Sequence, residues 1–277
     1  MQSEKVQQLP VIASSAPRAS RAVRRRVGSY LPYLYSVLGA LLAWWLLAAL
    51  LPSQFILATP LQTFTVLGGL LQKPDTYVHI VLTLMRLFIG FFIAEILGLI
   101  LGTLMGLRQY FERTFSLWVV IGLTIPSLVW AIITLMIFGL SEAGVIVAIA
   151  ITSFPVITVN IWGGVKSINT KLLDMAKVFR LSRADILLRV ILPQILPYVF
   201  SSSRYGIGIC WKIAVVVEML GSSNGVGYQF AYWFGLLSMS HVFAWTFILV
   251  VIMTVMEFGV IRVLERRVLA WRPEINF

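Results

Sequence analysis

Long apolar stretches separated by short polar segments dominate the chain. A helix needs about 20 consecutive apolar residues to cross a bilayer. Stretches that approach or exceed this length cover residues 32–51, 79–106, 115–138, 143–163, 195–220 and 241–263. They lack the period-two alternation of barrel strands and are much longer than the roughly 10 residues that such strands need. The pattern therefore predicts an all-α polytopic membrane protein with six transmembrane helices.

The composition agrees with this class of protein. Hydrophobic residues make up 59% of the chain and charged residues only 12%, whereas an ordinary soluble domain has about 25% charged residues. The chain has too little polar surface to be stable in water.

Lys and Arg residues predict the orientation of these helices. Nearly all of them lie in the N-terminal tail, the 107–114 loop, the 164–194 loop and the C-terminal end, whereas the opposite loops hold only Lys73. Because cytoplasmic loops carry an excess of Lys and Arg, both termini and the 164–194 loop are expected in the cytoplasm. The net charge of +11 then reflects topology and contact with anionic membrane lipids. No basic groove with interleaved aromatic residues suggests nucleic acid.

The chain divides into a tail and one membrane domain. Residues 1–28 are expected to form a flexible, basic cytoplasmic tail, because Pro10, Pro17 and several serines break any long helix. Residues 29–277 form the transmembrane domain, in which 52–78 is a periplasmic loop with a short helix after Pro60. The first apolar run is too long for an ordinary signal sequence and has no clean cleavage site, so it is expected to be a retained span.

A polar, mostly basic stretch lies between the fourth and fifth predicted spans. Residues 174–197 have the sequence DMAKVFRLSRADILLRVILPQILP. We expect a short helix over Lys177–Phe179 and a turn in which Ser182 caps a second helix, residues 184–192, that ends at Pro193. For any one of these residues taken alone, an ordinary amphipathic cytoplasmic loop is the alternative.

This stretch resembles the EAA loop of the membrane subunits of bacterial ABC importers. The pattern of that loop is Glu-Ala-Ala, a Gly four residues later, and an Ile-x-Leu-Pro ending. Residues 174–176 stand at the Glu-Ala-Ala positions, Arg180 stands where Gly is usual, and residues 190–193 match the ending. The resemblance implies that the 164–194 loop couples the chain to an ATPase. The coupling residues it implies are Asp174, Ala176, Phe179, Arg180, Leu181, Ser182 and Arg183.

Further motifs resemble those of the nitrate, sulfonate and taurine group of importer permeases. They are Ile125-Pro126-Ser127, Phe154-Pro155, residues 160–166, Trp211 with Val217-Glu218-Met219, residues 225–228, Leu264-Glu265-Arg266, Trp271 and Pro273. Together these motifs cover most of residues 80–273. The chain departs from the group at Ile132, where a second proline is common in the third span. The fold implied is the type I importer permease fold, also called MetI-like.

The resemblance implies the transmembrane permease subunit of an ATP-driven importer in a bacterial inner membrane. Its cargo would be a small anionic solute of the nitrate, sulfonate, taurine or bicarbonate type, moved by alternating access. Two copies of the chain would form a homodimer with the pathway at its axis. The partners implied are two ATP-binding cassette ATPases, docked on the 164–194 loops, and a periplasmic or lipid-tethered binding protein.

The sequence itself contains no phosphate-binding GxxxxGK[ST] loop, so the chain is not expected to bind ATP or to be an enzyme. ATP and Mg would belong to the ATPase. A secondary transporter or channel that works alone is the competing hypothesis. It would need a coupling-ion site or a selectivity filter, and the spans contain neither an acid cluster nor a repeated broken helix.

The remaining reactive side chains suggest no catalytic or metal site. His79 and His241 lie at the outer ends of predicted spans, and Cys210 is the one cysteine. No disulfide within the chain is possible, and no metal cluster is suggested. Cys210 is expected to be a packing residue.

Charged residues within the spans are costly and therefore informative. Depths estimated at about 1.5 Å per residue match Glu95 with Arg204, and Arg86 loosely with Glu218, as structural ion pairs. Lys212 has no depth-matched acid in the second or fifth span, so it is the leading candidate for a pathway cation, although Glu257 or the second copy could supply an acid. The candidates for pathway residues are Lys212, Pro126, Ser127, Trp211, Glu218 and Arg86.

Proline and glycine positions add two further expectations. Pro126 and Pro155 free backbone carbonyls inside spans, which fits either kinks near a pathway or ordinary packing. Gly98, Gly102 and Gly106 repeat every four residues on one face of the second span. This spacing allows close approach of another helix.

Overall fold

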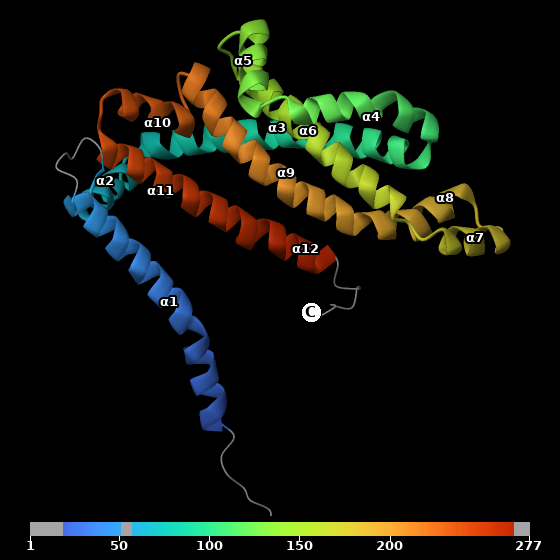
Figure 1. Cartoon of the computed structure of the whole chain (residues 1–277), viewed down its shortest axis with the longest axis horizontal. Coiled ribbons are helices and arrows are strands. Elements are labelled where there is room, and N and C mark those ends of the chain that lie inside the picture. The colour runs from blue at the N-terminus through green and yellow to red at the C-terminus, as the bar shows by residue number, and fades with distance from the viewer. Residues whose placement is uncertain (1–18, 51–56, 269–277) are drawn as a thin grey trace, which may run out of the picture. The chain divides into compact units, whose positions relative to one another are not determined.

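The computed structural model describes residues 19–50 and 57–268, and every regular element in these ranges is helical (Figure 1). The chain divides into two compact units, Met1–Pro52 and Ser53–Phe277. The prediction of an all-α protein is confirmed.

The first unit contains one described helix, α1 (Ala19–Leu50). It begins within the tail that was expected to be flexible over residues 1–28. The segment after Ala19 is rich in Ala, Arg and Val and has no proline before Pro32, so nothing in it interrupts a helix. Residues 1–18 lie outside the described part.

The second unit holds the remaining elements. In chain order they are α2 (Pro60–Leu71), α3 (Pro74–Leu107), α4 (Gln109–Thr124), α5 (Ser127–Phe138), α6 (Glu142–Lys166), α7 (Thr170–Val178), α8 (Arg183–Asp185), the π-helix η1 (Ile186–Ile191), α9 (Leu192–Gly221), α10 (Val226–Gly235), α11 (Met239–Val255), the π-helix η2 (Met256–Ile261) and α12 (Arg262–Val268). The helix expected after Pro60 is α2, and Thr59 and Gln62 form a capping box at its start.

Six spans are not confirmed over the described residues. Four helical segments are long and apolar enough to cross a membrane: Pro74–Leu107, Glu142–Lys166, Ile186–Gly221 and Met239–Gly259. The pair α4 and α5 makes a fifth if it is counted as one broken span, whereas the apolar part of α1, Tyr35–Leu50, is shorter. Residue 51, the end of the first predicted span, is outside the described part.

Pro126 and Pro155, the two prolines inside predicted spans, affect their helices differently. The third predicted span breaks between α4 and α5, which meet at 98°, because Pro126 disfavours the helical conformation of Ile125. Pro155, in contrast, lies inside an uninterrupted α6. It is buried, and a Cβ placed on Gly122 of α4 would lie only 2.7 Å from its ring. Pro155 is therefore a packing residue.

The most extensive helix contact in the second unit joins α3 and α6. A Cβ added at Gly98 would lie 2.6 Å from the side chain of Ile157, and one at Gly102 would lie 2.8 Å from that of Ile161. A Cβ added at Gly106 would likewise crowd the side chain of Val165. The residue numbers on the two helices rise together, so α3 and α6 run parallel. The expected close approach at these glycines is confirmed.

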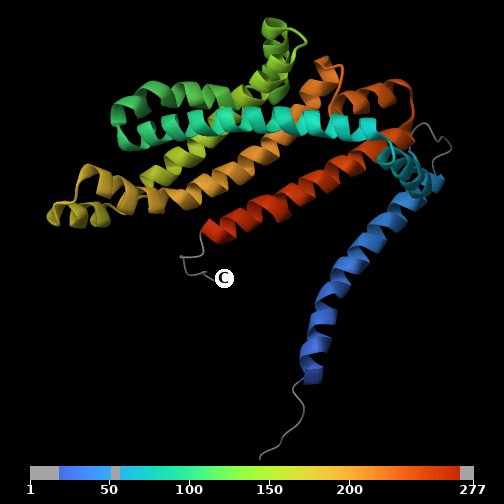
Figure 2. The same cartoon turned by 180° about the vertical axis from the view of Figure 1, so that it is seen from behind.

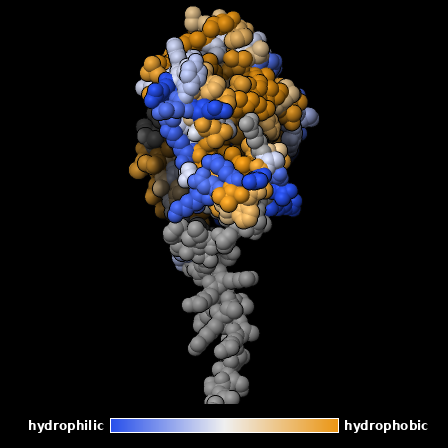
Figure 3. Space-filling model, turned by 90° about the vertical axis from the view of Figure 1, so that its right-hand side faces the viewer, coloured by the Kyte–Doolittle hydropathy of each residue, from blue (hydrophilic) through white to orange (hydrophobic). Residues whose placement is uncertain are grey.

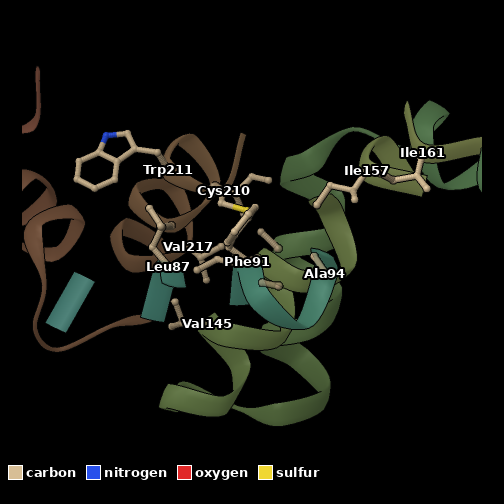
Figure 4. Packing of buried hydrophobic residues seen from close by; sticks show 14 of the residues in the cluster. Leu87, Phe91, Ala94, Val145, Ile157, Ile161, Cys210, Trp211 and Val217 are labelled. Atoms are coloured by element: carbon tan, nitrogen blue, oxygen red, sulfur yellow. The ribbon is translucent and has the colours of Figure 1, made fainter. Parts of the chain in front are cut away.

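Helix α9 covers this pair and completes the core. Figure 4 shows Leu87, Phe91 and Ala94 of α3 and Val145, Ile157 and Ile161 of α6 beside Cys210, Trp211 and Val217 of α9. Cys210 is fully buried there, as expected of a packing residue. A smaller cluster around Trp245 joins α2, α10 and α11. Figures 1 and 2 show α7 and α8 at one end of this unit and α10 at the other.

We predict that Gly98→Ala destabilises the chain by about 1–3 kcal/mol, because the added methyl group overpacks the contact with Ile157. Gly163→Ala is the matched control, since a Cβ there meets nothing within 4 Å. Thermal unfolding of the detergent-solubilised chain measures both. Equal stability of the two variants would contradict this account of the α3–α6 contact.

Candidate functional sites

The first candidate site is the hairpin of residues 167–191, which contains α7, α8 and η1. It follows α6 directly and is tied to α9 by two hydrogen bonds. The backbone N–H of Asn169 donates to Oε1 of Gln194 (2.9 Å), and the hydroxyl of Ser167 donates to that of Tyr198 (2.6 Å). The hairpin therefore has rigid connections to two long helices.

Helix α7 is longer than the predicted Lys177–Phe179 segment and ends in a Schellman motif. The N–H of Arg180 bonds the carbonyl of Lys177 (2.9 Å), and the N–H of Leu181 bonds that of Ala176 (3.1 Å). Arg180 is in the left-handed conformation, with φ 53°, which this motif requires and which glycine adopts most easily. The geometry explains why Gly is usual four residues after the last Ala of the EAA pattern.

The second half of the hairpin begins as predicted and ends differently. Ser182 Oγ accepts the N–H of Asp185 (3.1 Å), which confirms the cap. The helix does not stop at Pro193, because η1 leads without interruption into α9 and Leu192 N–H bonds the carbonyl of Leu187. In a regular α-helix a proline ring clashes with the carbonyl four residues earlier, and the wider π-turn accommodates it.

Apolar side chains are exposed on the hairpin. We define the apolar tip as Met175, Val178 and Phe179, which are 51%, 80% and 70% exposed. Ala176 is instead buried, so a bulky acid at this position would disrupt the packing around it. The sequence analysis missed Met175 and Val178, although their spacing from Phe179 could have indicated a shared face. Figure 3 shows hydrophilic and hydrophobic surface side by side at this end of the second unit.

The charged residues of the hairpin pair mainly with one another. Asp174 pairs with Lys177 (2.9 Å), and Asp185 pairs with Arg189 (3.1 Å). Arg180 is exposed, and no carboxylate of the described residues forms an ion pair with it. The side chain of Arg183 is outside the described part.

The second candidate site is an ion cluster centred on Arg86 of α3, at the end of the unit opposite the hairpin. Its buried guanidinium binds Glu142 through two hydrogen bonds of 2.5 Å and Glu218 through one of 2.6 Å, and it also bonds Asn224. Thr83 donates to the same Glu218 carboxylate. The expected pair of Arg86 and Glu218 is confirmed, whereas Glu142 and Asn224 were not anticipated.

This cluster joins the start of α6 and the turn before α10 to α3. The N–H of Gly227 donates to Glu218 (2.9 Å), and Nδ1 of His79 accepts the N–H of Gly225 (3.0 Å). Arg86 and Glu218 have no exposed side-chain surface, whereas the Glu142 side chain is 52% exposed. The cluster is thus arranged to hold several helices together.

The expected pair of Glu95 with Arg204 is wrong. Glu95 accepts a hydrogen bond from Ser203 (2.9 Å), and Arg204 pairs with Glu257 (3.1 Å) and Glu265. Estimates of depth ignore rotation about the helix axis. Because successive residues differ by about 100° in direction, Ser203 faces α3 whereas Arg204 faces the last helices.

The candidate pathway residues do not share one surface, since Arg86 and Glu218 are buried in the ion cluster. Lys212 is exposed on α9, and none of the described acids forms an ion pair with it, since Glu257 is paired with Arg204. Trp211, the residue before Lys212, is buried in the core. Pro126 and Ser127 are exposed at the bend between α4 and α5, and α5 packs on α9.

The family model described as "Binding-protein-dependent transport system inner membrane component" matches residues 96–270, which is more than half of the chain. The chain belongs to this family.

Several relatives of this permease are named as permease proteins for the transport of small solutes. The bicarbonate transport system permease protein CmpB of Synechococcus elongatus is 28% identical over 93% of each chain. The taurine transport system permease protein TauC of Escherichia coli is 27% identical over 85% of this chain and 88% of its own. The nitrate import permease protein NrtB of Synechococcus elongatus is 31% identical over 54% of each chain.

Solved structures of ABC importers share the fold of this permease. An amino acid ABC transporter crystallised with histidines matches with a TM-score of 0.58 at 20% identity, over 73% of this chain and 97% of that chain. The MetNI methionine ABC transporter in an inward-facing conformation matches with a TM-score of 0.57 at 20% identity, over 68% and 94%. The MetI-like fold class is confirmed.

We predict that Arg86→Met destabilises the permease by about 3–5 kcal/mol, because it leaves Glu218 buried without its cation. Lys166→Met is the matched control. It breaks the ion pair of Lys166 with Glu112, whose side chains are both partly exposed, and should cost at most about 1 kcal/mol. Thermal unfolding in detergent compares the two, and a small effect at Arg86 would exclude a structural role for the cluster.

Proposed function

We propose that this permease is the transmembrane subunit of an ATP-driven importer that works as a homodimer in a bacterial inner membrane and carries a small anionic solute. Two ATP-binding cassette ATPases dock on the cytoplasmic hairpins, and a periplasmic or lipid-anchored binding protein delivers the solute. ATP and Mg are bound by the ATPases, and this subunit is not an enzyme. The exposed apolar tip of the hairpin is the observation that supports this proposal most strongly, beside membership of the family.

The apolar tip favours docking into a partner. Met175, Val178 and Phe179 lie next to one another on a polar segment, and an apolar patch of this kind marks a contact surface. A short helix that places such residues in a groove is a common mode of recognition. The bonds from the hairpin to Gln194 and Tyr198 would transmit movement of the ATPase to α9. Such a movement would switch the pathway between inward-open and outward-open states.

The distribution of charge supports the orientation. Lys and Arg residues gather along the sequence in the 107–114 and 164–194 segments and in the two terminal segments. The hairpin and both termini therefore lie in the cytoplasm under this proposal.

Lys212 supports an anionic solute. A lysine facing lipid within the membrane would be costly, and the exposed residues of α9 at similar helical spacing include Ser201 and Tyr205. This polar face fits a water-filled pathway between two copies, unless the second copy supplies an acid for Lys212. Nitrate, taurine and bicarbonate, named for relatives, all carry an anionic oxygen group. No observation favours the alternative of a secondary transporter or channel.

We predict that Phe179→Asp abolishes or strongly reduces assembly with the ATPase, by about thirtyfold or more in affinity, as expected for an apolar anchor at the centre of an interface. Co-purification and solute-stimulated ATP hydrolysis measure this effect. Tyr110→Asp is the control, because Tyr110 is an exposed aromatic residue near the start of α4 and outside the hairpin. Wild-type assembly of the Phe179 variant would refute docking through the apolar tip.

We predict that Lys212→Met leaves the assembled transporter stable but impairs uptake, whereas Lys212→Arg retains it, because the charge attracts the solute. Uptake is measured with whichever of labelled nitrate, taurine or bicarbonate the wild type accumulates. Normal uptake by Lys212→Met would count against a pathway role. So would loss of stability, which indicates a structural pair with the second copy.

A further inference from the structure

The backbone of Arg180 is held in a costly conformation. Of the described residues other than glycine, Arg180 and Leu237 alone have positive φ angles. The left-handed conformation costs a residue with a side chain about 1 kcal/mol, and glycine would close the same turn without that cost. Strained residues cluster at functional sites, so this one suggests a role for the side chain.

The Arg180 side chain is available to a partner. It is exposed, and the nearby acids of the hairpin are already paired, Asp174 with Lys177 and Asp185 with Arg189. Its two N-terminal neighbours along the chain, Val178 and Phe179, belong to the apolar tip. The Schellman motif fixes the backbone on both sides of Arg180, so the guanidinium extends from a well-defined position.

We propose that Arg180 forms an ion pair with a carboxylate in the docking groove of the ATPase and that this pair selects the partner. The proposal rests on the docking of the hairpin to an ATPase proposed above. When the apolar tip enters the groove, water leaves the surroundings of Arg180, so its charge must be matched. The planar guanidinium binds a carboxylate through two parallel hydrogen bonds. An ATPase without an acid at this place would bury an unpaired cation and bind poorly.

Three variants test the charge separately from the backbone. Arg180→Asn removes the charge while keeping a residue that tolerates the left-handed conformation, and Arg180→Lys keeps the charge. Lys171→Gln is the matched control, because it removes one charge from an exposed residue at the other end of α7. Each is reconstituted in nanodiscs and titrated with the ATPase that co-purifies with the wild-type chain, at several salt concentrations.

We expect Arg180→Asn to weaken ATPase binding by about tenfold or more and to reduce its salt dependence. Arg180→Lys should bind with intermediate affinity, and Lys171→Gln should resemble the wild type. A fourth variant, Arg180→Glu, should bind worst and should recover when one Asp or Glu of the groove is changed to Lys. Wild-type affinity of Arg180→Asn, or an equal loss in Lys171→Gln, would overturn the proposal.

Anionic lipid headgroups are the other acidic partner available to Arg180. If the loss with Arg180→Asn appears in nanodiscs that contain phosphatidylglycerol and disappears in pure phosphatidylcholine, the lipid is the partner and the proposal fails. If the hairpin does not dock on an ATPase at all, the experiment gives a different result. No ATPase would co-purify with the wild-type chain, or Phe179→Asp would bind as well as the wild type.

Discussion

Helices α3 and α6 approach so closely that glycines on one contact isoleucine and valine side chains on the other, and the arrangement of the second unit follows from this contact. Within a bilayer no hydrophobic effect drives helices together, so packing at small residues and polar bonds must do so. The parallel register set by Gly98, Gly102 and Gly106 brings Glu142 to Arg86 at the end opposite the hairpin. At the hairpin end, Lys166 of α6 pairs with Glu112 of α4.

The two ends of this unit differ in their chemistry. At the end opposite the hairpin, a buried guanidinium and two carboxylates join three helices, and their mutual pairing leaves little freedom. At the hairpin end, the apolar tip and Arg180 are exposed. In the proposed function, the first end holds helices together and the hairpin end receives force from the ATPase.

Prolines have three different effects in this fold. Pro126 separates α4 from α5 at a bend of 98°, Pro155 packs against Gly122 inside a continuous helix, and Pro193 follows a π-helical turn. Each lacks a backbone donor. Whether the helix breaks, continues or widens depends on which neighbours surround the ring.

The sequence by itself determined the helical class, the family resemblance, the expected orientation, the close approach at the α3 glycines and the cap at Ser182. These follow from length, composition and short-range spacing, which act locally along the chain. Only the tertiary structure decided that Glu95 bonds Ser203, that Arg204 pairs with the last helices and that Ala176 is buried. Such partners depend on the rotation of each helix about its axis and on the register of its packing. A rotation of one residue, about 100°, exchanges one neighbour for another without changing the hydrophobic pattern.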